Sequence, residues 1–261
     1  MTSMHRETLL YHKDEGTAWI TLNRPGAQNR VNPQMAAELR EVCSAIGEDE
    51  DVLVVVVTGA GEVFCTGDEE PSTSHAPTEG GTSYLESWRV AHALGIIEKP
   101  VIAAINGDAL GHGLEIGLAC DIRIAAENAR LGLPNICQGT MPWDGGTQRL
   151  PRVVGKAWAT YLLLTGRTVD ASEALQIGLV HQVVPSGVLA ERASQLARSM
   201  ASMAPIAMRY VKEAVHKGMD MTLEQGLRLE TDLNLILQTT EDRAEGIASF
   251  LARRQPRFTG R

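Results

Sequence analysis

The chain has 261 residues and a formal net charge of −8, and its 24 basic side chains are scattered apart from a small group near the C-terminal end. This balance argues against a nucleic acid or a membrane surface as a partner. No apolar run is long enough to span a bilayer, and the N-terminal segment lacks a signal-peptide core, so we expect a cytoplasmic protein. The four cysteines form no C-x-x-C pair, which argues against a zinc ribbon or a disulfide framework.

The first part of the chain predicts a hairpin, a helix and a buried strand. Apolar and polar residues alternate over 9–22 around a turn at Gly16, which is typical of two paired strands. Asn32 before Pro33 marks a helix start, and apolar residues at helical spacing continue to the acidic turn at 48–51. The β-branched run over 53–57 is typical of a strand covered on both faces.

Strands and helices continue to alternate along the middle of the chain. The segment 71–83 is rich in Ser, Thr, Pro and Gly and predicts a mobile loop, and 139–146 predicts an irregular loop. The other predicted elements are strands over 101–105, 122–126, 129–133 and 180–184, and helices over 84–97, 147–150, 157–164 and 171–177.

Beyond residue 187 only amphipathic helices are predicted, over 188–201, 206–217, 223–238 and 241–253. The composition changes near residue 195. We therefore expect an α/β core with the active site over 1–195 and a helical C-terminal region over 196–261.

The strand over 101–105 leads into the stretch that concentrates candidate chemistry. Gly107, Gly111 and Gly113 allow the backbone to approach a ligand closely, and the helix that begins here points unpaired N–H groups into the same space. His112 and Glu115 stand three positions apart at this helix start, so both side chains are expected to face one pocket. The alternative is an ordinary set of turn glycines.

An ordered series of short motifs covers nearly the whole chain. It consists of Leu-Asn-Arg-Pro over 22–25, Phe-Cys-Thr-Gly-Asp over 64–68, Pro-Val-Ile-Ala-Ala-Ile-Asn-Gly over 100–107, Gly-Leu-Glu over 113–115, Gly-Gly-Thr-Gln-Arg-Leu over 145–150 and Ala-Leu-Gln-Ile-Gly-Leu-Val over 174–180. The series resembles the crotonase superfamily, the enoyl-CoA hydratase/isomerase enzymes.

The resemblance implies an α/β fold in which repeated ββα units form a ClpP-like spiral. It also implies that the helical C-terminal region assembles a homotrimer or a hexamer, a dimer of trimers. Family members stabilise an enolate oxyanion with two backbone N–H groups, which fall here on Thr66 and His112. Preorganised donors of this kind lower a barrier by about 3 to 4 kcal/mol each. The resemblance implies no metal and no cofactor other than coenzyme A as part of the substrate.

The family's hydratases use two glutamates, and this chain departs from that pattern. Glu115 matches the first, but Asn135 stands at the second position, after Pro134. An amide can hold a water molecule but cannot transfer a proton at neutral pH. Two-glutamate hydration and carboxylate-dependent isomerisation are therefore both in question.

Two further departures are His112, where relatives have glycine, and Asp144, in the loop that lines the family's pocket. Together they resemble the 6-oxocamphor hydrolase type of β-diketone hydrolase, in which such a dyad helps water to cleave a C–C bond without coenzyme A. A looser match places a glutamate of that branch on Glu230. An imidazole near neutrality with a carboxylate partner suits this chemistry. His112 is alternatively a structural ring, and Asp144 alternatively a cap for the helix over 147–150.

The sequence leaves three functions open. The leading hypothesis is hydration or dehydration of an acyl-CoA thioester, with Glu115 and Asp144 sharing the work on a water that Asn135 holds. The alternative is retro-Claisen hydrolysis of a β-diketone, and the third is a protein that only binds acyl-CoA or assembles with a partner. Trp143 and Asp68 are expected to contact the substrate, although Asp68 could instead be a solvated loop edge. The C-terminal arginines over 253–257 suit either nucleotide phosphates or a helix end.

Overall fold

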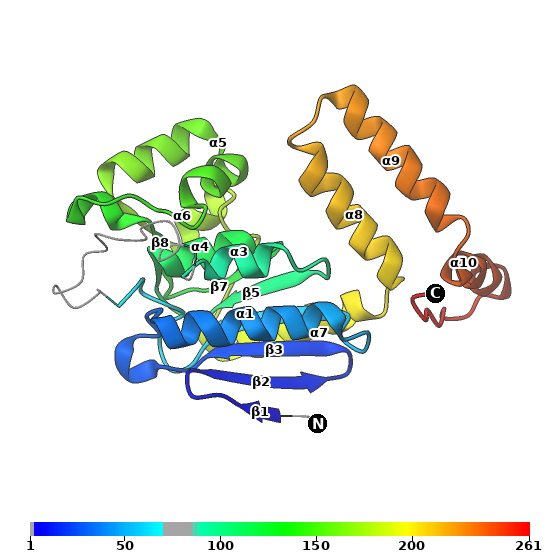
Figure 1. Cartoon of the computed structure of the whole chain (residues 1–261), viewed down its shortest axis with the longest axis horizontal. Coiled ribbons are helices and arrows are strands. Elements are labelled where there is room, and N and C mark those ends of the chain that lie inside the picture. The colour runs from blue at the N-terminus through cyan, green and yellow to red at the C-terminus, as the bar shows by residue number, and fades with distance from the viewer. Residues whose placement is uncertain (1–2, 70–85, 87) are drawn as a thin grey trace.

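The computed structural model describes residues 3–69, 86 and 88–261, in two sheets with helices on both faces of the larger one (Figure 1). The loop expected over 71–83 lies outside the described residues. The larger sheet has seven strands in the order β1-β2-β3-β4-β5-β7-β10, and the smaller has three in the order β6-β8-β9.

The larger sheet begins with an antiparallel hairpin. β1 (Ser3–His5) pairs with β2 (Leu9–Asp14), and β2 pairs with β3 (Thr17–Leu22). The turn residues Glu15 and Gly16 have φ of 45° and 75°, the left-handed geometry of a two-residue hairpin turn. The hairpin predicted over 9–22 is thus confirmed.

The remaining strands of this sheet run parallel to one another. β3 pairs with β4 (Val54–Gly59), which pairs in turn with β5 (Val101–Ile105), then β7 (Ile122–Ala126) and β10 (Gln182–Val184). Side chains that alternate along β4 enter two different cores, with Val55 and Val57 on one face and Val54 and Val56 on the other. Burial on both faces explains the continuous β-branched run.

Helices α1 (Pro33–Glu48), α3 (Val90–Gly95) and α4 (His112–Ala119) cover one face of the sheet. Asn32 accepts a hydrogen bond from the backbone N–H of Met35, so the predicted cap of α1 is present. The opposite face is covered by α7 (Leu189–Ala201), whose Leu189, Ala193 and Ala197 pack against β4, β5 and β7. The expected boundary at residue 195 therefore falls inside a helix that belongs to the core.

The smaller sheet brings the segment that carries Glu115 next to the segment that carries Asn135. β6 (Ala109–Leu110) runs parallel to β8 (Arg130–Gly132), and β8 pairs with β9 (Thr168–Asp170), a strand that the sequence did not predict. The chain continues from β6 into α4 and from β8 into the 3-10 helix η2 (Pro134–Gln138). Because the carboxyl ends of parallel neighbours meet at one edge, the segments that carry Glu115 and Asn135 lie side by side.

Helix α5 (Gly146–Thr165) includes both segments predicted to be helical, 147–150 and 157–164. Gly155 has φ of 78° and ψ of 160°, which are not helical values, so α5 consists of two helical stretches that meet at a kink there. The short elements that complete the core are η1 (Pro25–Ala27), α6 (Ala171–Gln176) and η3 (Ser186–Val188).

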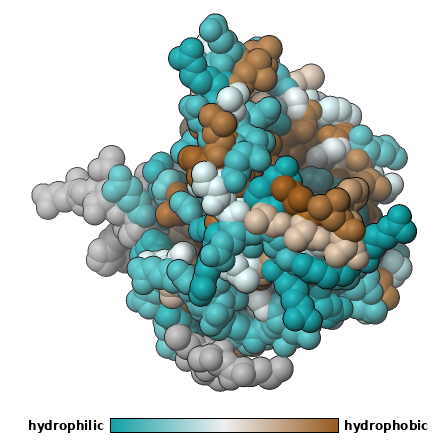
Figure 2. Space-filling view, turned by 90° about the vertical axis from the view of Figure 1, so that its right-hand side faces the viewer, coloured by the Kyte–Doolittle hydropathy of each residue, from teal (hydrophilic) through white to brown (hydrophobic). Residues whose placement is uncertain are grey.

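Three C-terminal helices project from the core: α8 (Pro205–Gly218), α9 (Leu223–Leu237) and α10 (Glu241–Ala252) (Figure 1). Lys212 on α8 ties them to the core, because its Nζ lies 2.8 Å from Asp121 Oδ2 and 2.9 Å from the Lys99 carbonyl oxygen. These helices expose many large apolar side chains, namely Val211, Val215, Met219, Leu223, Leu227, Leu235, Ile236, Phe250 and Leu251. Figure 2 shows apolar surface gathered in patches on this side of the molecule. No helix in the described part of the chain is long and apolar enough to cross a membrane.

Candidate active site

The two loops expected to supply the oxyanion donors are in direct contact. The Leu110 N–H donates to the Cys65 carbonyl oxygen at 2.9 Å, and a Cβ placed on Gly113 would lie 2.0 Å from that same oxygen. No side chain fits at Gly113 without moving the backbone. The glycine therefore permits the close approach that brings Thr66 and His112 into one site.

The two expected donors differ in availability. The His112 N–H begins α4 and has no acceptor within the described part of the chain. The Thr66 N–H donates to the Gln28 carbonyl oxygen at 3.2 Å, the long end of the normal range. The Thr66 N–H can therefore bind a substrate oxygen only after its hydrogen bond to the Gln28 carbonyl oxygen breaks.

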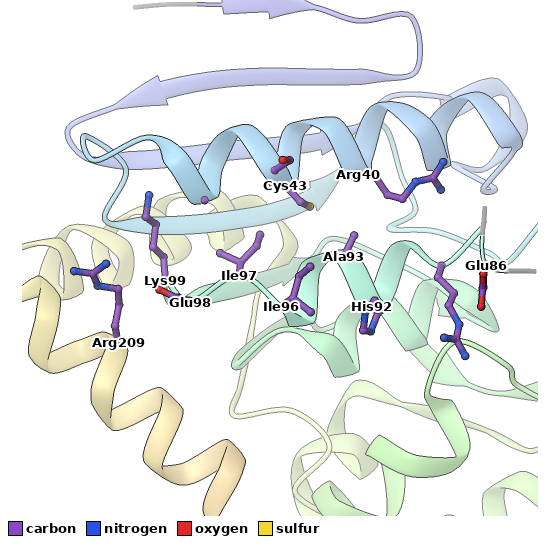
Figure 3. Close-up of a pocket in the computed structure, with 13 residues that line it drawn as sticks. Arg40, Cys43, Glu86, His92, Ala93, Ile96, Ile97, Glu98, Lys99 and Arg209 are labelled. Atoms are coloured by element: carbon purple, nitrogen blue, oxygen red, sulfur yellow. The ribbon is translucent and has the colours of Figure 1, made fainter. Parts of the chain in front are cut away.

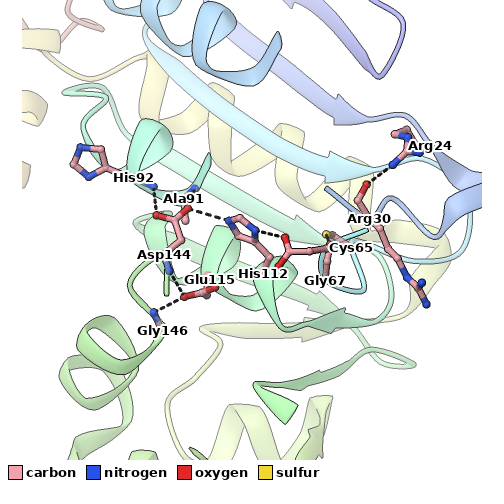
Figure 4. Close-up of polar contacts among 11 residues, drawn as sticks. Arg24, Arg30, Cys65, Gly67, Ala91, His92, His112, Glu115, Asp144 and Gly146 are labelled. Carbon is pink, nitrogen blue, oxygen red and sulfur yellow. Dashed lines mark hydrogen bonds and ion pairs between the residues drawn. The ribbon is translucent and has the colours of Figure 1, made fainter. Parts of the chain in front are cut away.

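Glu115 lies in the first turn of α4 and is only 1% exposed. Its Oε1 accepts two backbone hydrogen bonds, from the N–H groups of Asp144 and Gly146, each 2.8 Å long (Figure 4). Its Oε2 is buried and has no partner among the described residues. Burial raises the pKa of this carboxyl, even though the charge of His112 and both backbone hydrogen bonds lower it.

Asn135 presents a second unsatisfied acceptor. It stands in the first turn of η2, and its Oδ1 is buried without a hydrogen-bond partner in the described structure. Gly146 links the two segments, because a Cβ there would lie 3.0 Å from Leu133 Cδ1 and 3.1 Å from Glu115 Oε1. Buried polar atoms are almost always paired, so Glu115 Oε2 and Asn135 Oδ1 each indicate a place for a water or a substrate donor.

The His112 ring lies between two carboxylates. Its Nδ1 is 2.5 Å from Asp68 Oδ1 and its Nε2 is 3.0 Å from Asp144 Oδ2 (Figure 4). Carboxylates only accept hydrogen bonds, so this geometry places a proton on both ring nitrogens. Burial lowers the pKa of His112, but the hydrogen bonds to Asp144 and Asp68 outweigh it and raise the pKa to about 10.

Both carboxylate oxygens of Asp144 accept hydrogen bonds from protein groups. Its Oδ2 accepts from the Ala91 N–H at 2.6 Å as well as from His112, and its Oδ1 accepts from the His92 N–H at 3.2 Å. The carboxylate therefore caps the start of α3, whereas α5 has Gly145 at its N-cap position and no side-chain cap among the described residues. Three hydrogen bonds and 3% exposure favour a structural role for Asp144 over the expected one, in which it orients or activates a water.

The remaining predicted contacts have different outcomes. Asp68 is an ion-pair partner of His112 and not a solvated loop edge. The Trp143 ring packs against His112 in a T-shaped arrangement, with ring centroids 5.1 Å apart. Glu230 is exposed on α9 among the projecting helices, away from the core that holds Glu115, so its place in the site stays a prediction. Arg254 is paired with Glu245 at 2.6 and 2.7 Å.

Sequence reasoning missed the backbone partners of Asp144. Ala91 and His92 lie 53 and 52 residues before it, and nothing local to either segment signals the contact. A separate cavity of about 690 Å³ lies on this part of α3, between α1, α3 and α8, and the His92 side chain faces it (Figure 3). Its lining includes Arg40, Lys99 and Arg209 but no predicted catalytic residue.

The spiral core, the paired glycine loops and the buried glutamate define an enzyme of the crotonase fold. The sequence model of the enoyl-CoA hydratase/isomerase family matches residues 12–261. The chain therefore belongs to the enoyl-CoA hydratase/isomerase family, which confirms the crotonase resemblance.

Named relatives agree with this assignment. The chain is 44% identical over 245 residues to (E)-benzylidenesuccinyl-CoA hydratase of Thauera aromatica, covering 93% of this chain and 95% of the relative. It is 41% identical over 256 residues to 2,3-dehydroadipyl-CoA hydratase of Escherichia coli (strain K12), covering 97% and 99%. The crystal structure of an enoyl-CoA hydratase from Bacillus anthracis matches with a TM-score of 0.94 at 38% identity, covering 98% of this chain and 100% of that one. These relatives are named as hydratases, and none of the three supports the β-diketone alternative.

Proposed function

We propose that this protein adds water across the double bond of a 2-enoyl-CoA thioester, with Glu115 moving the protons and Asn135 holding the water. The observation that carries the proposal is the pair of buried acceptors, Glu115 Oε2 and Asn135 Oδ1, on adjoining segments, neither of which has a partner among the described residues. A water between them would donate one hydrogen bond to each oxygen, which satisfies both atoms.

Glu115 performs both proton transfers in this scheme. Its Oε2 takes a proton from the water as the water oxygen bonds to the β-carbon of the substrate. The neutral Glu115 then returns that proton to the α-carbon, so that one water is consumed and the enzyme is unchanged. A carboxyl whose pKa is raised by burial suits this cycle, because it must both accept and release a proton near neutral pH.

The thioester oxygen gains negative charge between the two steps. The His112 N–H at the start of α4 is available to stabilise it, and the helix dipole adds to this donor. The Thr66 N–H supplies the second donor once it exchanges the Gln28 carbonyl for the substrate. Coenzyme A enters as part of the substrate, and no further cofactor takes part.

Assembly and location belong to the same proposal. The exposed apolar face of α8, α9 and α10 supports association into a trimer or hexamer, because exposed apolar patches of this kind mark protein interfaces. We place the enzyme in the cytoplasm.

The test is hydration of crotonyl-CoA and 2,3-dehydroadipyl-CoA, followed by the loss of conjugated thioester absorbance. We expect wild-type activity, and in Glu115→Gln a loss of kcat of about 100-fold or more, since acid–base catalysis contributes about that much. Glu127→Gln, an exposed carboxylate outside the site, is the matched control and should retain activity. Full activity in Glu115→Gln, or cleavage of a cyclic 1,3-diketone without hydration of either thioester, would overturn the proposal.

A further inference from the structure

The His112 side chain joins two chain segments that each hold another part of the site. Asp68 follows Thr66 by two residues and so belongs to the oxyanion loop. Asp144 belongs to the loop whose backbone holds Glu115. His112 lies between them with its side chain fully buried.

We propose that His112 is a positioning residue that clamps the oxyanion loop and the Glu115 carboxylate into one arrangement through its contacts with Asp68 and Asp144. The inference rests on the proposed hydration, because the clamp is important only if Glu115 is the catalytic acid and base. It removes His112 from the acid–base role that its residue type suggests.

The contact with Asp68 fixes the two oxyanion donors relative to each other. The backbone hydrogen bond from Leu110 to Cys65 holds the two loops together only before the donors. The His112–Asp68 pair closes the other side, because it joins the side chain of one donor residue to the segment that follows the other. Asp68 is itself anchored, since Val31 bonds to the backbone of both Gly67 and Glu69 at 2.9 and 2.8 Å.

The contact with Asp144 fixes Glu115. His112 Nε2 and the N–H groups of Ala91 and His92 hold the Asp144 carboxylate on three sides. The backbone N–H of Asp144 then donates to Glu115 Oε1. With Oε1 held in this way, the orientation of Glu115 is set and Oε2 is left for the water.

The ring has no nitrogen to offer to a substrate or a water. Both nitrogens face carboxylates, and Trp143 packs against the ring in a T-shaped arrangement. The charged groups around His112 are Asp68, Asp144 and Glu115, all of which favour the imidazolium. The ring is therefore charged throughout the neutral range, which disqualifies it as a general base.

One experiment compares kcat and KM for wild type, His112→Gln and Asp68→Asn. We expect kcat to fall by about 100-fold in His112→Gln, the scale of a small displacement of catalytic groups, while KM changes little. The Glu127→Gln control should match wild type. Asp68→Asn, which alters a partly exposed side chain, tests the clamp if His112→Gln does not fold, and it should also lose kcat. A folded His112→Gln with wild-type kcat, or a folded Asp68→Asn with wild-type kcat, would overturn the clamp.

A second readout does not depend on hydratase activity. Nitrogen-15 NMR of histidine-labelled protein, assigned with His112→Gln, should show both ring nitrogens of His112 protonated at about pH 8, above the ordinary pKa of histidine. In Asp68→Asn the ring should lose its second proton at lower pH than in wild type. An unprotonated nitrogen in wild type at this pH would overturn the clamp. A doubly protonated ring in a wild type that hydrates no thioester would support the ion pairs and overturn only the proposed function.

Discussion

At the scale of single residues, Glu115 and Asn135 both bind the proposed catalytic water, but only Glu115 exchanges protons with it. Both present a buried oxygen that has no partner in the described part of the chain, but only the carboxyl can change its protonation state. This explains how a chain with an amide at the second position remains a hydratase in our proposal. The amide needs only to orient the water.

Asn135→Ala should therefore reduce kcat for crotonyl-CoA hydration by about fivefold, because it removes one neutral hydrogen bond worth about 1 kcal/mol. Asn135→Glu supplies a second carboxylate and should retain activity. Steady-state kinetics measure both, with the exposed Asn128→Ala as control. An Asn135→Ala enzyme as fast as wild type would remove the amide from the mechanism.

The ion pairs of His112 predict a pH dependence of stability. The pKa of His112 is about 10 in the folded protein against 6.5 for an ordinary histidine. The stability that its ion pairs contribute to the folded state is therefore fully present below pH 6.5. It is lost progressively as pH rises through 10, where the folded ring loses its proton. Urea unfolding of wild type and His112→Gln should show a stability difference that narrows between about pH 7 and 10. A difference that widens over this range would contradict the assigned charge.

At the scale of elements, the site depends on the start of α4 lying against the loop that contains Cys65. The approach is too close for any side chain at position 113. Helix α4 is thus placed by the absence of a Cβ as much as by the apolar residues that it buries.

Gly113→Ala should separate the two oxyanion loops and lower kcat by about 100-fold. We also expect a loss of about 1 to 3 kcal/mol in unfolding free energy, the usual cost of overpacking. Gly47→Ala is the matched control, because a Cβ at that position in α1 meets open space and should be neutral or stabilising. Kinetics and thermal unfolding of both variants measure the contrast, and equal behaviour would argue against the close approach.

At the scale of the whole molecule, the projecting C-terminal helices are an unusual feature for a chain that acts alone. Phe250 is 82% exposed and Leu251 is 76% exposed on α10. Burial of two such side chains in an interface would contribute about 1.5 to 3 kcal/mol each.

Phe250→Asp combined with Leu251→Asp should lower the oligomer mass measured by light scattering, because both charges would be buried at the proposed interface. Leu164→Asp, a similarly exposed apolar residue on α5, is the control and should leave the mass unchanged. An unchanged oligomer in the double variant would exclude this part of α10 from the interface.

The family and the elements with local sequence signals could be predicted from the amino-acid sequence. A capping Asn before Pro33, a Gly16 turn and β-branched strands report their own conformation, and the ordered motifs identified the fold and Glu115. The contacts of His112 and Asp144 could not be predicted in this way, because the His112–Asp68 and Asp144–Ala91 contacts span 44 and 53 residues. Such contacts depend on the path of all the chain between them. The same reason accounts for α7 joining the core and for the strand β9, whose pairing partner β8 lies in a distant segment of the chain.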